Sequence, residues 1–324
     1  MHRLYFRKHT KVWRKVMKKI LITGGTGMVG HALQRVIPDA SFVSSTQFDL
    51  RDRRATEEMF RTYAPDQVIH LAAKVGGIKA NMENLGDFYT DNIRINTNVL
   101  QSALKYKTRK VLSLLSTCIY PKEVLYPMTE DQIHLGPPHN SNYAYAYAKR
   151  MLDIQSQAYR DQYGCNFITA VPNNLYGEND NYDLNNSHVI PALIHKMYKA
   201  EQNNESVVLW GDGTPLREFT YSLDLANILL FLLEHYDGRE PINVGNTGEY
   251  SIREVAQLVG KNLGFENHYV WDINKPAGQY RKPSNNDKLM RLGWRPDMYT
   301  KFEVGIANAC SWFLDNYPNI RGAE

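Results

Sequence analysis

Tyr145 and Lys149 stand four residues apart and are the side chains of this sequence best suited to chemistry at a carbonyl group. Residues 140–150 read NSNYAYAYAKR, and if this run is helical the two side chains lie on one face. An ammonium group there is expected to lower the pKa of the phenol, which can then hand a proton to a carbonyl oxygen. Tyr106 and Lys110 share the spacing, so the pair needs support from its surroundings.

Ser116 supplies that support. Residues 110–115 read KVLSLL, an apolar run typical of a buried parallel strand, and Ser116 follows it directly. Open α/β sheets bind ligands at the carboxyl ends of their strands, so Ser116 is expected in the site and Tyr106 at the opposite edge. Alone, the Tyr145–Lys149 pair would indicate a solvated helix face. With Ser116 and the glycine-rich turn described next, it predicts a reductase site.

A glycine-rich turn follows the first predicted strand, residues 18–23, and opens a helix at residues 31–37. Gly24, Gly27 and Gly30 let the turn close tightly, let backbone N–H groups approach a pyrophosphate, and let the helix pack against the strand. The pattern between a strand and a helix predicts a dinucleotide site, and a turn without a ligand is the alternative.

The next two strands bear on which dinucleotide binds. The second predicted strand, residues 41–45, ends in two serines and no acidic residue. An acid there would bind the ribose 2′-hydroxyl of NAD, so its absence favours NADP. The third predicted strand, residues 66–73, ends in two alanines, which are small enough for a cofactor to approach closely.

Strands and helices alternate through a fifth strand at residues 166–171 and then stop alternating near residue 177. This order predicts an α/β protein, a Rossmann-like doubly wound parallel sheet with a smaller C-terminal α/β substrate-binding lobe. The expected division is a cofactor-binding domain at residues 18–176 plus about 220–246, and a substrate lobe at 177–219 plus 247–324. Other expected elements are helices at 54–63, 81–106 (broken at Gly86), 188–201, 223–235 and 302–317, strands at 207–210 and 241–246, a turn at 211–219, and a helix opened by a capping box at Ser251–Glu254.

Bulk composition narrows the class of protein. The net charge of +4 arises from residues 1–17, which hold six basic residues and no acid, so the rest of the chain does not predict nucleic-acid binding. We expect this basic stretch to be a disordered extension, with a start at Met17, a basic arm or a transit peptide as alternatives. No apolar run is long enough to span a bilayer. Three cysteines in no metal or disulfide spacing predict a cytoplasmic protein without a metal site.

Five further segments carry a resemblance to a known family. They read STCIYPK (116–122), PNNLYG (172–177), SHVIPA (187–192), WGDGTPLREF (210–219) and WFLDN (312–316). With the glycine turn and the Tyr–Lys pair, the chain resembles the extended short-chain dehydrogenase/reductase family, in its nucleotide-sugar branch, from about residue 18 to 317. The resemblance implies NADP(H), a GDP-4-keto-6-deoxy-sugar substrate and a homodimer.

The resemblance implies two coupled reactions on GDP-4-keto-6-deoxymannose, inversion at C3 and C5 and then reduction at C4, which together give GDP-L-fucose. Cys118 and His188 match the acid and base of the inversions, and both side chains have solution pKa values close enough to neutral to exchange protons. Ser116 and Tyr145 would hydrogen-bond the C4 oxygen, and Lys149 would hold the nicotinamide ribose. Without the resemblance, a lone cysteine after a strand indicates packing, and a histidine at a helix start indicates a cap.

The resemblance also implies the ligand contacts. The GDP-sugar would meet Lys196, Trp210 and Arg217, which otherwise would be a solvated lysine, a core tryptophan and a rim arginine. The cofactor would contact Gly24, Thr26, Gly27, Met28, Val29, Gly30, Asp49, Leu50, Leu71, Ala72, Ala73, Leu114, Leu115, Ser116, Lys149, Pro172, Asn174, Leu175 and His188.

Departures from the family pattern leave alternatives open. Thr26 stands where some bacterial relatives have arginine, and Asn173 and Glu178–Asn179 differ from the usual residues near the fifth strand. Another GDP-4-keto sugar, of a colitose or heptose pathway, is therefore a second interpretation. A 4,6-dehydratase or an NAD-recycling 4-epimerase is disfavoured because Cys118-Ile119 stands where dehydratases carry Asp-Glu. A non-catalytic NADP-binding sensor is the alternative from another class.

Overall fold

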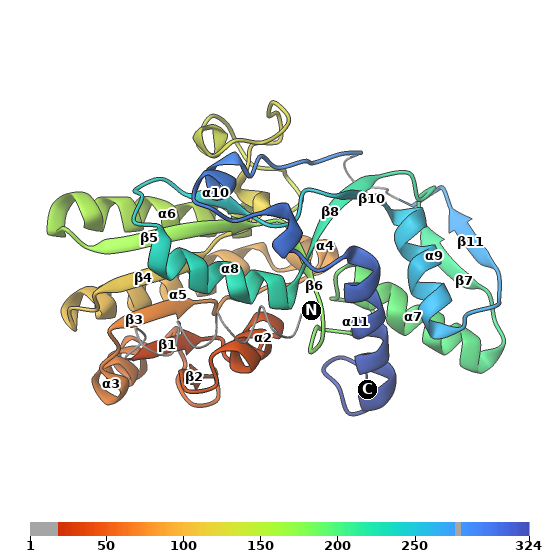
Figure 1. The fold of residues 1–324 in the computed structure, drawn as a ribbon, viewed down its shortest axis with the longest axis horizontal. Helices are drawn as coiled ribbons and strands as arrows, with labels where there is room; N and C mark the ends of the chain where they lie inside the picture. Colours follow the sequence, from red (N-terminus) through yellow and green to blue (C-terminus); the bar gives the residue numbers. More distant parts are fainter. Residues whose placement is uncertain (1–18, 276–279, 324) are drawn as a thin grey trace.

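A parallel sheet forms the centre of the computed structural model, which describes residues 19–275 and 280–323 (Figure 1). Its six strands lie in the order β2-β1-β3-β4-β5-β9, and every neighbouring pair is parallel. Their bounds are β1 (Ile20–Thr23), β2 (Ser41–Val43), β3 (Gln67–His70), β4 (Lys110–Leu114), β5 (Asn166–Pro172) and β9 (Ile242–Val244). The doubly wound sheet predicted from the sequence is confirmed, including the late return of the chain at β9. The expected basic extension lies outside the described residues.

Helices cover both faces of this sheet, which explains why its strands are apolar on both sides. Side chains alternate along β1: Ile20 and Ile22 pack with α2 (Met28–Val36) and α8 (Ser222–His235), whereas Leu21 packs on the opposite face. That opposite face is covered by α3 (Arg53–Tyr63), α5 (Leu85–Lys105) and α6 (Tyr143–Tyr163).

The helix expected at residues 81–106 is two helices, and the predicted break is wrong by two residues. Helix α4 (Ile78–Glu83) is separated from α5 by Asn84, whose φ of −129° and ψ of 41° are not helical. The Asn84 side chain donates to the carbonyl of Ala80 at 3.0 Å, which satisfies a free acceptor at the end of α4. Gly86 lies inside the first turn of α5, where no Cβ contact requires a glycine.

A second group of elements has its own apolar core, beside the sheet in Figure 1. It contains α7 (Val189–Asn203), α9 (Ile252–Leu263), α11 (Phe302–Asn316), a sheet of β7 (Val207–Trp210) with β11 (Tyr269–Asp272), and a sheet of β10 (Glu249–Ser251), β8 (Leu216–Tyr221) and β6 (Asn174–Tyr176). The short helix α10 (Asp287–Arg291) lies near β9. The capping box is confirmed, because Ser251 and Glu254 bond each other's backbone at the start of α9.

The turn expected at residues 211–219 is only partly a turn. Strand β8 begins at Leu216 and pairs with both β10 and β6, so Arg217 projects from a strand whose position the sheet fixes. Strands β6, β10 and β11, which have only three or four residues each, are not predicted from the sequence.

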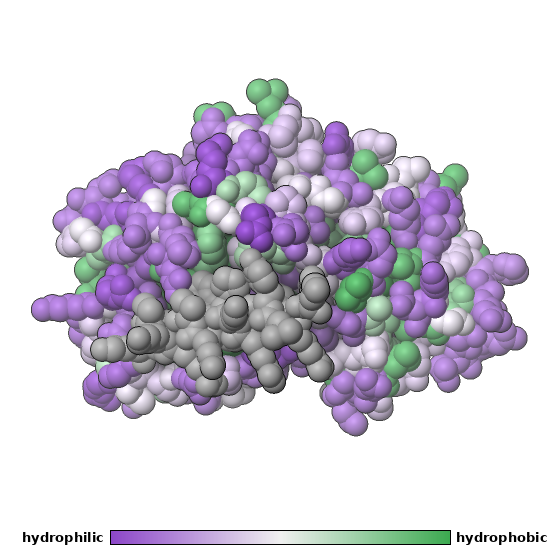
Figure 2. Space-filling view, in the orientation of Figure 1, coloured by the Kyte–Doolittle hydropathy of each residue, from purple (hydrophilic) through white to green (hydrophobic). Residues whose placement is uncertain are grey.

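The surface carries both polar and apolar side chains. Figure 2 shows a mostly hydrophilic face on which hydrophobic side chains are scattered. Within the two described ranges, no helix is long and apolar enough to cross a membrane.

Candidate active site

The glycine-rich turn is shaped as a cradle for an anion. Gly24 has φ of +72° and lies against the backbone of Ala72, and a Cβ on Gly30 would collide with the carbonyl of Gly25. Gly27 is the N-cap of α2, with no side-chain cap and no acidic residue in the first turn. The first N–H groups of α2 are therefore available to a pyrophosphate.

The other predicted cofactor residues follow the carboxyl ends of adjacent strands. Leu71, Ala72 and Ala73 follow β3, Leu114 ends β4 and Leu115 follows it, and Pro172 ends β5, with Asn174 and Leu175 on the following strand β6. Thr26, Met28 and Val29 belong to the turn and the first turn of α2. Leu50 and Leu115 are buried in the core, so any contact they make with a cofactor goes through their backbone. Asp49 is half-exposed and paired with Arg51 at 2.8 Å, and this hydrogen bond lowers the pKa of the carboxyl group.

Helix α6 distinguishes the three tyrosines of residues 140–150. Tyr143 is 44% and Tyr147 40% exposed, whereas Tyr145 turns inward, 6.4 Å from the ring of Phe88. Lys149 is 3% exposed, and its Nζ donates to the carbonyl of Leu114 at 2.8 Å and lies 6.0 Å from the centre of the Tyr145 ring. The structure therefore brings Tyr145 and Lys149 together beside the end of β4.

The direction of the predicted pKa shift of Tyr145 is wrong. Burial raises the pKa of the phenol, because it removes the charged form from water, and the nearby Cys118 thiol raises it further. The same burial lowers the pKa of Lys149 to about 8, with the Cys118 thiol opposing the shift. Tyr145 thus stays protonated at neutral pH, as a proton donor must, while Lys149 titrates within a reachable range.

We expect activity to fall as the pH rises through about 8, because Lys149 then loses its charge. The measurement is kcat/KM between pH 6 and 10, and Lys149→Arg should move the alkaline limb upwards because a guanidinium keeps its proton. A wild-type profile that stays flat to pH 10 would contradict the assignment.

Ser116 and Cys118 lie on the turn that follows β4. Ser116 is the N-cap of a short 3-10 helix (Thr117–Ile119), and its Oγ accepts from the backbone N–H of Cys118 at 3.5 Å. Burial raises the pKa of the Cys118 thiol, whereas the Ser116 hydrogen bond and the charges of Lys282 and Lys149 act in the opposite direction. The pKa values of Tyr145 and Lys149 respond in turn to Cys118. Four of the five predicted catalytic residues therefore share one site.

His188, the fifth, is the N-cap of α7 in the second group of elements. Its side chain is exposed, yet the surrounding protein removes enough water to lower the pKa of the imidazole. This combination is typical of a residue that lines a cleft. In the part of the chain that the structure describes, no hydrogen bond or ion pair joins His188 to Cys118.

The loop before His188 is hydrogen-bonded to the loop that follows β3, which contains predicted cofactor residues. The backbone N–H groups of Asn186 and Ser187 donate to the carbonyl of Asp183 at 3.1 and 2.8 Å, and Gly77 donates to the carbonyl of Asn186 at 3.0 Å. Gly77 belongs to the loop that continues from the cofactor residues after β3. The position of His188 is thereby tied to the end of the central sheet.

The C-terminal turn, residues 319–323, holds the other side of the same loop. The backbone N–H of Tyr182 donates to the carbonyl of Arg321 at 2.9 Å. Gly322 has φ of +78°, and a Cβ there would collide with the backbone of Asp183. The end of the described chain is therefore packed directly against the segment that leads to α7.

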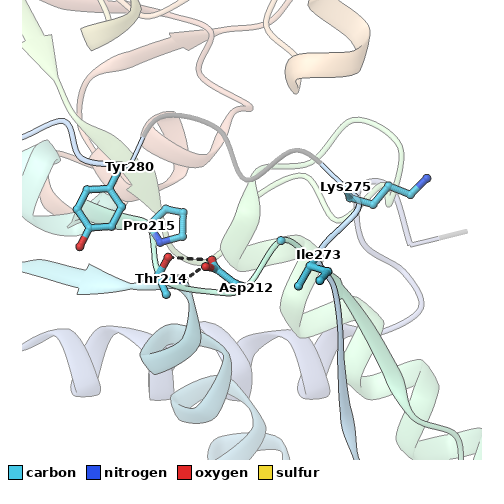
Figure 3. A pocket seen from close by; sticks show the side chains of 7 residues that line it. Asp212, Thr214, Pro215, Ile273, Lys275 and Tyr280 are labelled. Carbon is cyan, nitrogen blue, oxygen red and sulfur yellow. Dashed lines mark hydrogen bonds between the residues drawn. The ribbon is translucent and has the colours of Figure 1, made fainter.

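The predicted substrate residues lie on three elements of the second group. Lys196 on α7 has its Nζ 6.0 Å from the ring centre of Trp210, and Trp210 is 57% exposed, so it is not a core residue. Arg217 donates to the carbonyl of Leu216 at 2.7 Å, and burial lowers the pKa of its guanidinium. A pocket of 460 Å³ follows β7, lined by Gly211, Asp212, Thr214, Pro215, Ile273, Lys275 and Tyr280 (Figure 3).

Lys282 is a site residue that sequence reasoning missed. It is half-buried, and it is close enough to both Cys118 and Arg217 for their charges to act on its own. The segment around it is fixed, since Ser284 donates to the buried carboxylate of Glu218 through N at 3.0 Å and Oγ at 2.6 Å. No local pattern marks Lys282, because only the fold brings it to a turn far earlier in the chain.

Sequence reasoning also did not identify His70, which contacts α6 through Asn96. Its Nδ1 lies 2.8 Å from Thr23 Oγ1 and its Nε2 3.2 Å from Asn96 Oδ1, and Asn96 donates to the carbonyl of Ala148 at 3.3 Å. Burial, with the charge of Lys149, lowers the pKa of His70 to about 3, so the ring is neutral. This buried network links the end of the first strand to the helix that carries Tyr145.

Four cations of the site lack an acidic partner. Among the described residues, no carboxylate forms an ion pair with Lys149, Lys196, Arg217 or Lys282. Cations held without counter-ions favour an anionic ligand. The arrangement thus combines a proton donor, a thiol and a site for negative charge.

Known proteins resemble this chain over nearly its whole length. The NAD dependent epimerase/dehydratase family matches residues 20–245. The GDP-L-fucose synthase of Dictyostelium discoideum is 42% identical over 314 residues, 94% of this chain and 98% of that protein. The GDP-L-colitose synthase of Yersinia pseudotuberculosis is 36% identical over 93% of this chain and 99% of that protein. A crystal structure of a GDP-L-fucose synthetase from Naegleria fowleri bound to NADP superposes with a TM-score of 0.89, at 41% identity over 94% of this chain and 95% of that one.

Proposed function

This chain belongs to the NAD-dependent epimerase/dehydratase family, and on that basis we propose that it converts GDP-4-keto-6-deoxymannose to GDP-L-fucose with NADPH. The observation that carries the proposal is a thiol, Cys118, placed beside Ser116, Tyr145 and Lys149. A plain ketoreductase needs the last three residues, whereas an additional proton-transfer group fits an enzyme that also inverts carbon centres.

The inversions use the acidity of hydrogens next to a ketone. A base removes the proton from C3 or C5, the electron pair moves to the C4 oxygen as an enolate, and an acid returns a proton from the opposite face. Cys118 and His188 are the proposed acid and base. Ser116 and Tyr145 donate hydrogen bonds to the C4 oxygen and stabilise the enolate as its charge develops.

Reduction follows at the same carbonyl group, C4 and its oxygen. Bound NADPH supplies a hydride for C4, and Tyr145 gives its phenolic proton to the C4 oxygen. The raised pKa of the phenol keeps that proton in place until the alkoxide forms. Lys149, held by the carbonyl of Leu114, is the proposed contact to the nicotinamide ribose. One oxyanion site thus serves both reactions.

The cradle at Gly24–Gly30 and the small side chains after β3 fit a dinucleotide. The proposed cofactor-binding domain is residues 18–176 plus about 220–246, and the proposed substrate lobe is residues 177–219 plus 247–324. Lys196, Trp210 and Arg217 are the proposed contacts to the GDP-sugar, with Arg217 on the diphosphate. We place the enzyme in the cytoplasm.

The test uses purified protein, NADPH and GDP-4-keto-6-deoxymannose in D₂O, with the product analysed by NMR. Deuterium at both C3 and C5 together with NADPH consumption is the expected result. NADPH consumption without deuterium at either carbon would leave a 4-ketoreductase and would remove the roles of Cys118 and His188.

A second candidate is a related GDP-4-keto sugar, favoured by the similarity to the colitose synthase. The departures at Asn173 and Glu178 do not strengthen it. Asn173 bonds Glu218, Thr220 and the Asn246 carbonyl, and Glu178 bonds Arg35 and Tyr221, so both side chains are used within the protein. An activity assay in which several GDP-4-keto sugars compete as substrates tests this candidate. A strong preference for another sugar would replace the fucose assignment.

We expect a homodimer through the exposed apolar side chains of α5 and α6. Tyr89, Tyr143, Tyr147 and Met151 line a depression of 390 Å³ there. Met151→Glu should shift the protein to a monomer in light scattering, because it places a charge in the contact. Val304→Glu, at an exposed position on α11, is the control. An unchanged mass for Met151→Glu would contradict this interface.

A further inference from the structure

Arg150 directly follows Lys149 on α6, and the proposed reaction gives it no role. Its side chain is only 6% exposed. Its Nε donates to the carbonyl of Ile119 at 2.6 Å, and its Nη1 donates to the carbonyl of Gly136 at 2.7 Å. A buried guanidinium that binds backbone carbonyls of two loops fixes both loops relative to the helix.

The first of these loops carries the catalytic groups. Lys149 binds the carbonyl of Leu114 and Arg150 that of Ile119, so neighbouring residues of α6 hold both ends of residues 114–119. Ser116 and Cys118 lie between the two contacts. The helix that supplies the phenol therefore also sets the position of the thiol.

The second loop braces the first. The backbone N–H of Lys122 donates to the carbonyl of Pro137 at 2.9 Å, and Pro121 forms a β-bridge with Pro138. Gly136, the second partner of Arg150, directly precedes this pairing. Residues 119–122 and 136–138 thus form one unit, which a single guanidinium fastens to α6.

The charge of Arg150 is not neutralised. Its hydrogen-bond partners are carbonyls, and its Nη2 is buried and donates to no acceptor in the described part of the chain. Its guanidinium carbon lies 5.4 Å from the centre of the Tyr147 ring, and Tyr147 and Cys118 both lie within electrostatic reach of Arg150. Cys118 is also influenced by the charges of Lys149 and Lys282 and by the hydrogen bond with Ser116. Arg150 thus adds positive charge near a group that must pass through a thiolate.

We propose that Arg150 is a positioning residue that fixes the Cys118 thiol relative to Tyr145 and so permits the inversions at C3 and C5. This inference rests on the proposed function, because its kinetic test measures the inversions at C3 and C5. It requires the two carbonyl contacts at Ile119 and Gly136, and not merely a positive charge. Reduction depends less on Arg150, because Lys149 holds the Ser116 end of the segment independently.

The test compares Arg150→Met and Arg150→Lys with a matched control, Arg160→Met. Arg160 lies on the same helix and also binds a carbonyl, that of Asp237 at 2.6 Å, far from the thiol in sequence and fold. The kinetic measurement is deuterium at C3 and C5 per NADPH oxidised, in D₂O. Arg150→Met should lower this ratio about tenfold to a hundredfold, since small misplacements of reacting groups have effects of this size.

A second measurement does not depend on turnover. The rate at which iodoacetamide alkylates Cys118 is followed against pH by peptide mass spectrometry. Arg150→Met should move the midpoint to higher pH, and Arg150→Lys should restore the midpoint but not the deuterium ratio, because lysine keeps the charge and loses the two-carbonyl fork.

The outcomes separate this inference from the proposed function. Wild-type protein that incorporates no deuterium refutes the proposed function, and a deuterium ratio in folded Arg150→Met equal to that of the wild type overturns the role of Arg150. The role is also overturned if Arg150→Lys restores the deuterium ratio fully. If the deuterium ratio falls equally in Arg150→Met and Arg160→Met, in proportion to the loss of thermal stability of each variant, Arg150 only stabilises the fold.

Discussion

Tyr145→Phe is expected to lower the rate of NADPH oxidation by about 10²–10⁴-fold, the usual contribution of a positioned general acid. Phenylalanine keeps the ring that packs against Phe88 but has no proton to give to the C4 oxygen. The alkoxide formed by hydride transfer would then remain unprotonated in a buried site, which is costly. Folding and cofactor binding should be almost unchanged.

The control for this prediction lies on the same helix. Tyr143→Phe and Tyr147→Phe remove the hydroxyl groups of two exposed tyrosines of the same sequence run. Stopped-flow NADPH oxidation gives the rates, and quenching of protein fluorescence gives the cofactor affinity. Tyr145→Phe with a rate within a factor of about three of wild type would refute the acid role.

Cys118→Ala should separate the two reactions. We expect exchange of deuterium into C3 and C5 to fall by about 10²–10⁴-fold, because a proton-transfer group is lost. Reduction of a 4-keto sugar should persist, since Ser116, Tyr145 and Lys149 remain. His188→Gln should give the same pattern, as the second group of the pair.

Two further observations complete this experiment. Cys165→Ala changes a half-buried thiol that was not predicted in the site and should leave both reactions unchanged. NMR of the sugar after partial turnover shows which carbon has exchanged. Equal losses of exchange and reduction in Cys118→Ala would place the thiol in the common oxyanion site and not in the inversions.

Local patterns in the sequence predicted the central sheet well. Runs such as residues 110–115 are apolar throughout because helices cover both faces, and the glycine turn identifies itself by its position between a strand and a helix. Some short strands, among them β10 and β11, were not predicted, since so few residues show little periodicity in hydrophobicity. The Gly-Asp-Gly-Thr-Pro residues before Arg217 predict a turn around it, whereas the structure shows a strand from Leu216.

The candidate site was predictable where its residues lie in recognisable segments. Lys282 and His70 were not, because their roles arise from contacts between distant parts of the chain. The pKa of Tyr145 was predicted in the wrong direction for a related reason. Sequence spacing shows a neighbouring charge, but it does not show how completely the fold removes water from the phenol.

The packing of the C-terminal turn against the loop before α7 bears on how this enzyme can be engineered. Ile320 and Ala323 are buried, so a fusion partner or affinity tag joined at this end would strain a segment that supports His188. We expect such fusions to reduce ketones normally and still to be poor epimerases. Tags and immobilisation linkers are therefore better placed before β1, and directed evolution of inversion activity can include residues 319–323, remote in sequence from every catalytic group.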